Sequence, residues 1–314
     1  MYINATGYYV PTGRVPNEYF TPRMGVTPEW IEQRTGIRTR ARAGENETVD
    51  TMGVCAVENA IPKLPYGIKD VDLIVAAHYC TYDSVATLAH KVQREYGIAG
   101  AKAVYVSSAC SSFINGLEVV EGYFAVGKAT KALLICSEHN SYYSDDTDTK
   151  AGHLWGDAAV AYFISKDKVA DSDMKILDVF TEGLGHIGKG PEGVTLRPKE
   201  EGISMPDGRD VFIHACKNMV YSLNKSLEHL GIGLNDISKL ITHQANKRIV
   251  AQVAHQLGLG MDSFLNNIEE YGNTGSASAA LVLAENLDKI HKGEKVALMV
   301  FGGGYSCGCF VVEV

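Results

Sequence analysis

Short apolar runs alternate with stretches of helical spacing along most of the chain. Residues 73–77 and 132–136 form such runs in the first half, and residues 239–241 and 296–301 repeat the pattern in the second. Uninterrupted apolar runs of this length are typical of strands buried on both faces, and the intervening helices cover such sheets. The pattern therefore predicts an α/β protein built on mixed sheets.

The two halves of the sequence also resemble each other. When Lys131 is aligned with Lys295, an offset of 164 residues, Cys110 falls opposite Thr274, which follows Asn273. Apolar residues with helical spacing come after both positions, at Phe113, Leu117, Val120 and Phe124 and at Ala277, Leu281, Ala284 and Leu287. We predict a duplicated fold with one half at 1–165 and the other at 166–314, each presenting the N-terminus of a central helix.

Composition narrows the class of protein. The 314 residues are 46% hydrophobic, which is enough for a large core, and the net charge of −8 argues against nucleic acid as a partner. No apolar run is long enough to cross a bilayer, and no export signal precedes the first strand. The seven cysteines are scattered and odd in number, so we expect a cytoplasmic protein without a disulfide framework and without a membrane partner.

One cysteine lies where a strand pattern changes into a helix pattern, in the segment VYVSSACSSFINGLEVV (104–120). At a helix N-terminus, unpaired N–H groups and the helix dipole lower the pKa of a thiol and can stabilise an oxyanion. The ordinary alternative for Cys110 is a buried structural residue. The small residues around it leave room for a ligand and favour a nucleophile.

Two further polar segments follow strand patterns. His243 comes directly after an apolar run in ITHQANKRI (241–249), and Asn273 lies in the glycine-flanked segment YGNTGSAS (271–278). Taken singly, His243 could be a structural histidine and Asn273 an ordinary N-cap. Together with Cys110 they occupy equivalent strand-to-helix junctions, which indicates one shared site.

With these residues in place, the chain resembles the thiolase-fold condensing enzymes, and most closely β-ketoacyl-acyl-carrier-protein synthase III. The resemblance runs nearly end to end and rests on WIEQRTGIRTR (30–40), the Cys110 junction, WGD (155–157), THQANKRI, YGNTGSAS and the terminal FGGG (301–304). It implies a thiolase-like duplicated fold with five layers, αβαβα, in which two mixed sheets enclose central helices.

The resemblance also implies a reaction. Cys110 is expected to accept an acyl group from an acyl-coenzyme A primer, and His243 and Asn273 to stabilise the enolate formed when malonyl-acyl carrier protein loses carbon dioxide. The N–H groups of Cys110 and Gly303 are expected to form the oxyanion hole. This condensation would initiate fatty-acid or related acyl-chain synthesis. The alternative is a synthase-III-like acyltransferase that moves the acyl group to a non-malonyl acceptor.

Coenzyme A thioester is expected as a substrate, with no permanently bound cofactor and no metal. By resemblance, Trp30 and Arg34 would sandwich the adenine, Asn246 and Arg248 would line the pantetheine and phosphate entrance, and Phe301 the tunnel wall. The bare sequence of residues 29–37 could equally be an amphipathic helix with Arg34 on its solvated face.

The chain departs from the family pattern in three places. Val85 stands where the family has an aromatic residue that lines the primer pocket of the partner in a homodimer, which predicts room for a primer larger than acetyl.

The entrance offers Ile213, His255 and Gln256 where basic residues would meet an acidic carrier protein. The sequence therefore supports binding of the carrier protein less strongly than it supports the condensing reaction. The loop at 145–157 lacks the usual arginine, and Lys150 could replace it. Primer length and the final acceptor stay open.

Overall fold

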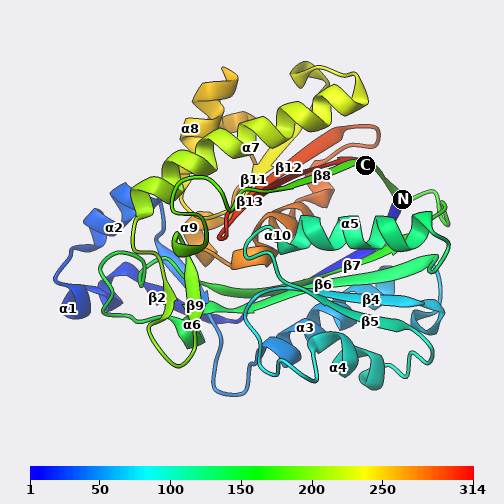
Figure 1. Ribbon diagram of the computed structural model, residues 1–314, viewed down its shortest axis with the longest axis horizontal. Coiled ribbons are helices and arrows are strands. Elements are labelled where there is room, and N and C mark those ends of the chain that lie inside the picture. The colour runs from blue at the N-terminus through cyan, green and yellow to red at the C-terminus, as the bar shows by residue number, and fades with distance from the viewer.

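The computed structural model of the chain describes residues 1–314. Nine strands form one sheet in the order β11-β12-β13-β8-β1-β7-β6-β4-β5 (Figure 1). They are β1 (Tyr2–Tyr9), β4 (Leu73–Ala77), β5 (Lys102–Val106), β6 (Lys131–His139), β7 (Asp157–Ser165), β8 (Met174–Gly183), β11 (Lys239–Thr242), β12 (Lys295–Gly302) and β13 (Ser306–Glu313). The predicted apolar runs all lie within β4, β6, β11 and β12.

The sheet consists of two half-sheets with a narrow joint. Strands β1 and β8 pair only at Tyr2 with Lys175 and at Ile3 with Met174. The two predicted mixed sheets are therefore connected by hydrogen bonds at this one seam.

The two half-sheets have the same strand directions. In the first, β4 and β6 are parallel while β6–β7 and β7–β1 are antiparallel. In the second, β11 and β12 are parallel while β12–β13 and β13–β8 are antiparallel. Strands β6 and β12 begin at Lys131 and Lys295, the two residues that the sequence alignment superposes. The boundary between residues 165 and 166 stays a prediction.

Helices complete the five layers. Helices α3 and α4 cover the first half-sheet, α5 and α10 lie between the half-sheets, and α7 covers the second with α8 beside it (Figure 1). Their bounds are α3 (Val49–Ala60), α4 (Leu88–Glu95), α5 (Ser112–Ala125), α7 (Gly208–Leu230), α8 (Lys247–Leu257) and α10 (Ser278–Glu285). None of the helices combines the length and apolarity needed to cross a bilayer.

The two central helices join the halves through their side chains. All four predicted core positions of α5 are buried: Phe113, Leu117, Val120 and Phe124. Every residue of α10 except Glu285 is buried, because this helix touches strands of both half-sheets and has no solvent-facing side. It ends earlier than the sequence pattern predicts, since Leu287 lies in a separate 3-10 turn.

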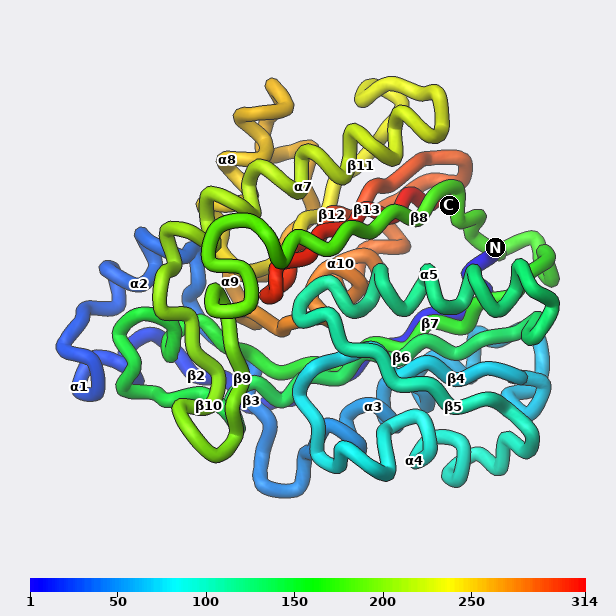
Figure 2. The backbone as a smooth tube through the Cα atoms, viewed as in Figure 1, coloured from blue at the N-terminus to red at the C-terminus, as the bar shows by residue number.

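The smaller elements gather at one end of the molecule, on the left in Figure 2. They are α1 (Thr21–Met24), α2 (Pro28–Thr35), α6 (Asn140–Tyr143), α9 (Ile268–Tyr271) and the hairpins of β2 (Gly13–Pro16) with β3 (Thr39–Arg42) and β9 (Thr195–Arg197) with β10 (Gly202–Ser204). The first turn of the central helix α5 points toward this end, so the loops surround the Cys110 junction.

Candidate active site

Cys110 lies in a tight turn between β5 and α5. Strand β5 ends at Val106 and α5 begins at Ser112 with Ser111 as its N-cap, so the cysteine precedes the helix as predicted. The residue before it, Ala109, has a left-handed backbone with φ of 49°. A non-glycine residue in this region is strained, and such strain often occurs where a functional side chain must be aimed in one direction.

A glycine allows a second backbone to approach this turn. A Cβ on Gly302 would lie 2.8 Å from the Ser108 carbonyl oxygen, 2.9 Å from the Ser111 nitrogen and 3.0 Å from the Cys110 nitrogen. The end of β12 therefore packs directly on the turn that carries Cys110, and only glycine permits that approach. Gly303 follows it at the edge of the same site.

One cavity connects the predicted residues. Its wall contains six of them, namely Cys110, His243, Asn246, Asn273, Phe301 and Gly303, drawn from both halves of the chain. Twelve of its 18 lining residues are hydrophobic, among them Val211, Phe212 and Met219 on the inner face of α7. The cavity is thus an apolar tunnel with few polar groups, the usual character of a site for a small or extended organic ligand.

His243 is held in one orientation. It follows β11, its backbone N–H donates to the Met299 carbonyl at 2.7 Å, and its Nδ1 lies 2.6 Å from the Ser278 Oγ. The Ser278 Oγ accepts the Gln244 N–H, and His243 Nδ1 is the sole acceptor near its hydroxyl proton. The hydroxyl therefore donates to Nδ1, which leaves the hydrogen on Nε2. Burial lowers the pKa of the imidazole to about 4, so the ring is neutral at pH 7.

Asn273 is fixed from both sides. Its backbone pairs with the WGD segment, with its N–H donating to the Leu154 carbonyl at 2.8 Å and its carbonyl accepting the Gly156 N–H at 2.9 Å. Its side-chain Oδ1 accepts the Gly275 N–H at 3.0 Å. The Nδ2 group has no acceptor within the protein, so a donor is available to a ligand in the cavity.

The ionisation of Cys110 differs from the sequence-based expectation. Burial, and after it the negative charge of Glu138, raise the pKa of the thiol to about 12. The sequence suggested a thiol acidified by a helix N-terminus, but Cys110 stands two residues before α5 and is enclosed by protein. The thiol is therefore protonated at neutral pH.

The predicted adenine sandwich does not have the expected form. Trp30 and Arg34 are one turn apart on α2, and the Arg34 guanidinium lies 4.1 Å from the Trp30 ring centroid. No base fits between two groups that stack on each other. An adenine would have to displace the guanidinium or stack on its outer face. The edge of His153, which sequence reasoning missed, also meets Trp30, with ring centroids 5.7 Å apart.

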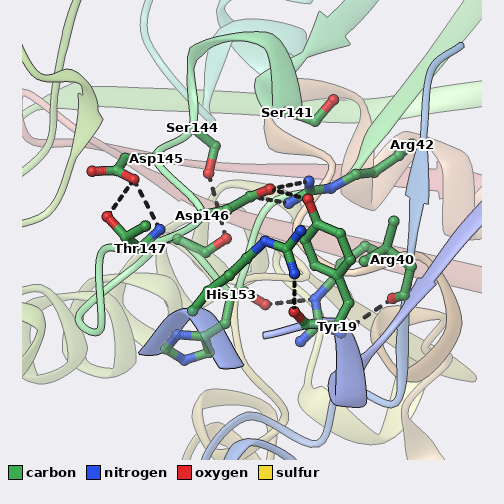
Figure 3. Close-up of polar contacts among 12 residues, drawn as sticks. Tyr19, Arg40, Arg42, Ser141, Ser144, Asp145, Asp146, Thr147 and His153 are labelled. Carbon is green, nitrogen blue, oxygen red and sulfur yellow. Dashed lines mark hydrogen bonds and ion pairs between the residues drawn. The ribbon is translucent and has the colours of Figure 1, made fainter. Parts of the chain in front are cut away.

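The loop that lacks the usual arginine is anchored by an ion pair (Figure 3). Arg42 binds Asp146 through two hydrogen bonds of 2.8 and 2.6 Å, and Tyr19 donates to the same carboxylate at 2.8 Å. Asp146 therefore anchors this loop to the first half of the chain. Lys150 is exposed and has no ion-pair partner.

The other predicted residues lie outside the tunnel or have a second role. Asn246 is the N-cap of α8, because its side chain accepts the Arg248 N–H at 2.8 Å. Arg248 is exposed at the mouth, with its guanidinium 5.9 Å from the ring of Phe212 in the tunnel wall. Val85 is 85% exposed in the loop before α4 and does not line the tunnel.

A five-layered duplicated fold, with a cysteine from the first half facing a histidine and an asparagine from the second, defines a thiolase-fold condensing enzyme. Comparison with known proteins refines this class. The family model described as 3-Oxoacyl-[acyl-carrier-protein (ACP)] synthase III matches residues 105–184, and the model of its C terminal matches residues 227–314.

Known relatives match the chain along its length. It is 35% identical to β-ketoacyl-[acyl-carrier-protein] synthase III of Deinococcus deserti, over 97% of this chain and 88% of the relative, and 32% identical to that of Sphingopyxis alaskensis, over 99% and 98%. The crystal structure of 3-oxoacyl-[acyl-carrier-protein] synthase III from Aquifex aeolicus VF5 superposes with a TM-score of 0.92 at 28% identity, over 100% of this chain and 99% of that one. The chain belongs to the 3-oxoacyl-[acyl-carrier-protein] synthase III family, and it is an acyltransferase of this type.

Proposed function

We propose that the protein condenses an acyl-coenzyme A primer with malonyl-acyl carrier protein, with Cys110 as nucleophile and His243 and Asn273 as its partners. The observation that carries this proposal is that all three side chains line one apolar tunnel at the junction of the two halves. An acyltransferase with a non-malonyl acceptor needs the cysteine and a base for the acceptor's proton, but it forms no enolate for two neutral donors to stabilise. The presence of both donors favours the condensing reaction.

In the first step the Cys110 sulfur attacks the thioester carbonyl of the primer. The new carbon–sulfur bond forms as coenzyme A leaves, and the proton lost from Cys110 ends on the coenzyme A sulfur. The backbone N–H groups of Cys110 and Gly303 have no acceptor within the protein, so both are available to the developing oxyanion. The acylated Cys110 is neutral, which suits its apolar surroundings.

In the second step the malonyl thioester loses carbon dioxide. The electron pair of the broken bond moves into an enolate, whose oxygen would accept hydrogen bonds from the His243 Nε2–H and the Asn273 Nδ2–H. Both donors are neutral and held in place, so they stabilise the negative charge without protonating the carbanion. The enolate carbon then attacks the acyl group on Cys110, and the cysteine sulfur leaves as a thiolate that takes a proton from solvent.

The entrance is proposed to lie between α2 and α8, which pack against each other. Arg248 and Asn246 stand at the inner end of this region and Trp30 and Arg34 on the neighbouring helix, so the phosphates and adenine of coenzyme A would meet these four residues. Basic groups near the entrance are few, since Lys247 is paired with Glu269. The carrier protein as partner and a cytoplasmic location stay predictions from sequence and resemblance.

The proposed reaction predicts release of carbon dioxide. With an acyl-coenzyme A primer and radiolabelled malonyl-acyl carrier protein, we expect labelled carbon dioxide and a β-ketoacyl product in equal amounts. A protein that forms the acyl-enzyme but releases no carbon dioxide would instead fit the alternative acyltransferase. Malonyl-coenzyme A in place of the carrier-protein thioester is the matched control for recognition of the carrier.

The primer pocket is proposed to be completed by Val85 of a second subunit. Strand β5 is the outer strand of the sheet, and the exposed side chains of Tyr82, Val85 and Tyr142 are apolar or aromatic. An unpaired strand edge near such groups suits a homodimer contact.

A small residue at this position predicts use of primers longer than acetyl. In a panel of about two to ten carbons, we expect Val85→Phe to reduce the ratio of hexanoyl to acetyl activity about tenfold, because the ring would fill the pocket. Val126→Phe, at another exposed valine, is the control. Strict acetyl preference of the unmodified protein, or sedimentation as a 34.0 kDa monomer, would contradict this pocket.

A further inference from the structure

A carboxylate without a counter-ion is buried beside the proposed nucleophile. Glu138, near the end of β6, is completely inaccessible to solvent and forms no ion pair with a lysine, arginine or histidine. Its oxygens accept the backbone N–H groups of Tyr79 at 3.3 Å and Cys80 at 2.9 Å, and both the N–H and the hydroxyl of Ser276. Burial raises the pKa of this carboxyl to about 7. Burying an unpaired carboxylate costs free energy, and four donors hold this one in place, which indicates that the residue has a specific role.

The donors belong to different halves of the fold. Tyr79 and Cys80 follow β4 in the first half, whereas Ser276 lies three positions after Asn273 in the second. Asn140 adds a parallel link, because its Nδ2 donates to the Gly156 carbonyl at 2.8 Å and to the Asn273 carbonyl at 3.3 Å. Its Oδ1 accepts the Tyr79 hydroxyl at 2.7 Å. The segment that carries Asn273 is therefore fastened to the strand end beside Cys110.

The packing leaves this connection little freedom. A Cβ on Gly275 would lie 2.5 Å from the Tyr79 hydroxyl and 3.0 Å from the Glu138 Cγ. Any shift of Glu138 would therefore be transmitted to the turn between Asn273 and α10, since close-packed groups cannot move independently.

The carboxylate also acts through its charge. The negative charge of Glu138 contributes to the raised pKa values of six acids, namely Tyr79, Cys80, Tyr105, Cys110, Cys136 and Tyr143. His139, the next residue in the chain, faces Asp157 instead, at 3.9 Å. No cation offsets Glu138, so its negative charge opposes formation of a thiolate at Cys110.

We propose that Glu138 is a positioning residue for the condensation: its carboxylate aligns the Asn273 segment with the nucleophile, and its charge adds to burial in opposing thiolate formation at Cys110. The inference rests on the proposed roles of Cys110 and Asn273. Alkylation of a thiol needs no substrate. An alkylation experiment can therefore test the role of Glu138 even if the proposed condensation is wrong.

The test is Glu138→Gln, which keeps the size of the side chain and removes the charge. The rate at which iodoacetamide modifies the Cys110 peptide is measured against pH by mass spectrometry. Without the carboxylate we expect the midpoint of this profile to fall by at least half a pH unit, which is about threefold more thiolate at a given pH.

The same variant tests the aligning role. An amide cannot accept all four donors, so we also expect the rate of condensation to fall about tenfold while acylation of Cys110 is retained. An unchanged or higher midpoint would overturn the charge role, and unchanged condensation the aligning role.

Two variants control for loosened structure. Asp157 is also fully buried and accepts the Ala43 and Ser141 N–H groups at 2.8 and 2.9 Å, but it forms no hydrogen bond or ion pair with the second half. Asp157→Asn should leave the alkylation midpoint unchanged. An equal shift in this variant would mean that the Glu138→Gln shift comes from a loosened structure around Cys110, and the proposal would be refuted. Ser276→Ala keeps the charge and should lower condensation without moving the midpoint. It tests the alignment even if Glu138→Gln does not fold, and unchanged condensation would refute it.

Discussion

Replacing Cys110 with alanine is expected to abolish acyl transfer. No other side chain in the tunnel can form a thioester, so acylation of the protein should fall at least about a thousandfold. Intact mass spectrometry after incubation with acyl-coenzyme A measures this directly, since the unmodified protein should gain one acyl group and Cys110→Ala none.

Cys55 provides the matched control for this experiment. It is the one cysteine of the seven that is not buried, and it lies on α3, which covers the outer face of the first half-sheet. Cys55→Ala should acquire the same adduct as the unmodified protein. An equal adduct on Cys110→Ala would show that the nucleophile is another residue, and both enzymatic hypotheses would lose their basis.

Replacing Asn273 or His243 with alanine is expected to separate the two steps. Removal of one preorganised donor from a developing oxyanion costs roughly 10²–10³ in rate, so condensation and carbon dioxide release should fall by about that factor. Acylation of Cys110 should stay within about threefold, because the first step uses the backbone donors instead. Rates of adduct formation and of carbon dioxide release measure the two steps independently.

Variants at the two ends of α10 sharpen this test. Ser278→Ala removes the group that fixes the His243 tautomer and should reduce carbon dioxide release about tenfold, less than removal of the imidazole. Asn286→Ala deletes a buried amide that donates to the Val282 carbonyl at 2.7 Å, far along the helix, and should leave both steps intact. Equal loss of acylation and condensation in Asn273→Ala would contradict the proposed division of roles.

The sequence predicted the fold well because duplication left a regular pattern. The apolar runs of β4, β6, β11 and β12 are central strands, and aligning Lys131 with Lys295 superposes the starts of two of them. The equivalence is incomplete at β5, since the second half has only a single bridge between Leu240 and Phe264 at the corresponding edge. A single bridge involves too few residues to produce an apolar run, so the sequence pattern could not predict it.

The sequence predicted which side chains form the site. It did not predict the properties that depend on contacts with residues distant in the chain. Cys110, His243 and Asn273 do share one tunnel. The pKa of Cys110 was expected in the wrong direction, because burial and Glu138 are invisible in the local sequence. Ser278 lies within a segment already singled out, yet its bond to His243 exists only because β11 and α10 are neighbours.

Two contacts differ in how far the sequence could predict them. The stacking of Arg34 on Trp30 could have been anticipated, since residues four apart on a helix are neighbours. The partner of Asp146 could not, because Arg42 is 104 positions away in the chain.

Few hydrogen bonds connect the two half-sheets, and the candidate active site draws its residues from both of them. Two residue pairs connect β1 to β8, and the remaining cohesion comes from the packing of α5 and α10 and from the hydrogen bonds that hold the Asn273 segment to the first half. A small separation of the half-sheets would move the nucleophile away from both donors while each half kept its secondary structure. Activity should therefore vanish before the helices melt, and a thioester that touches both halves would act as a clamp that stabilises the native state.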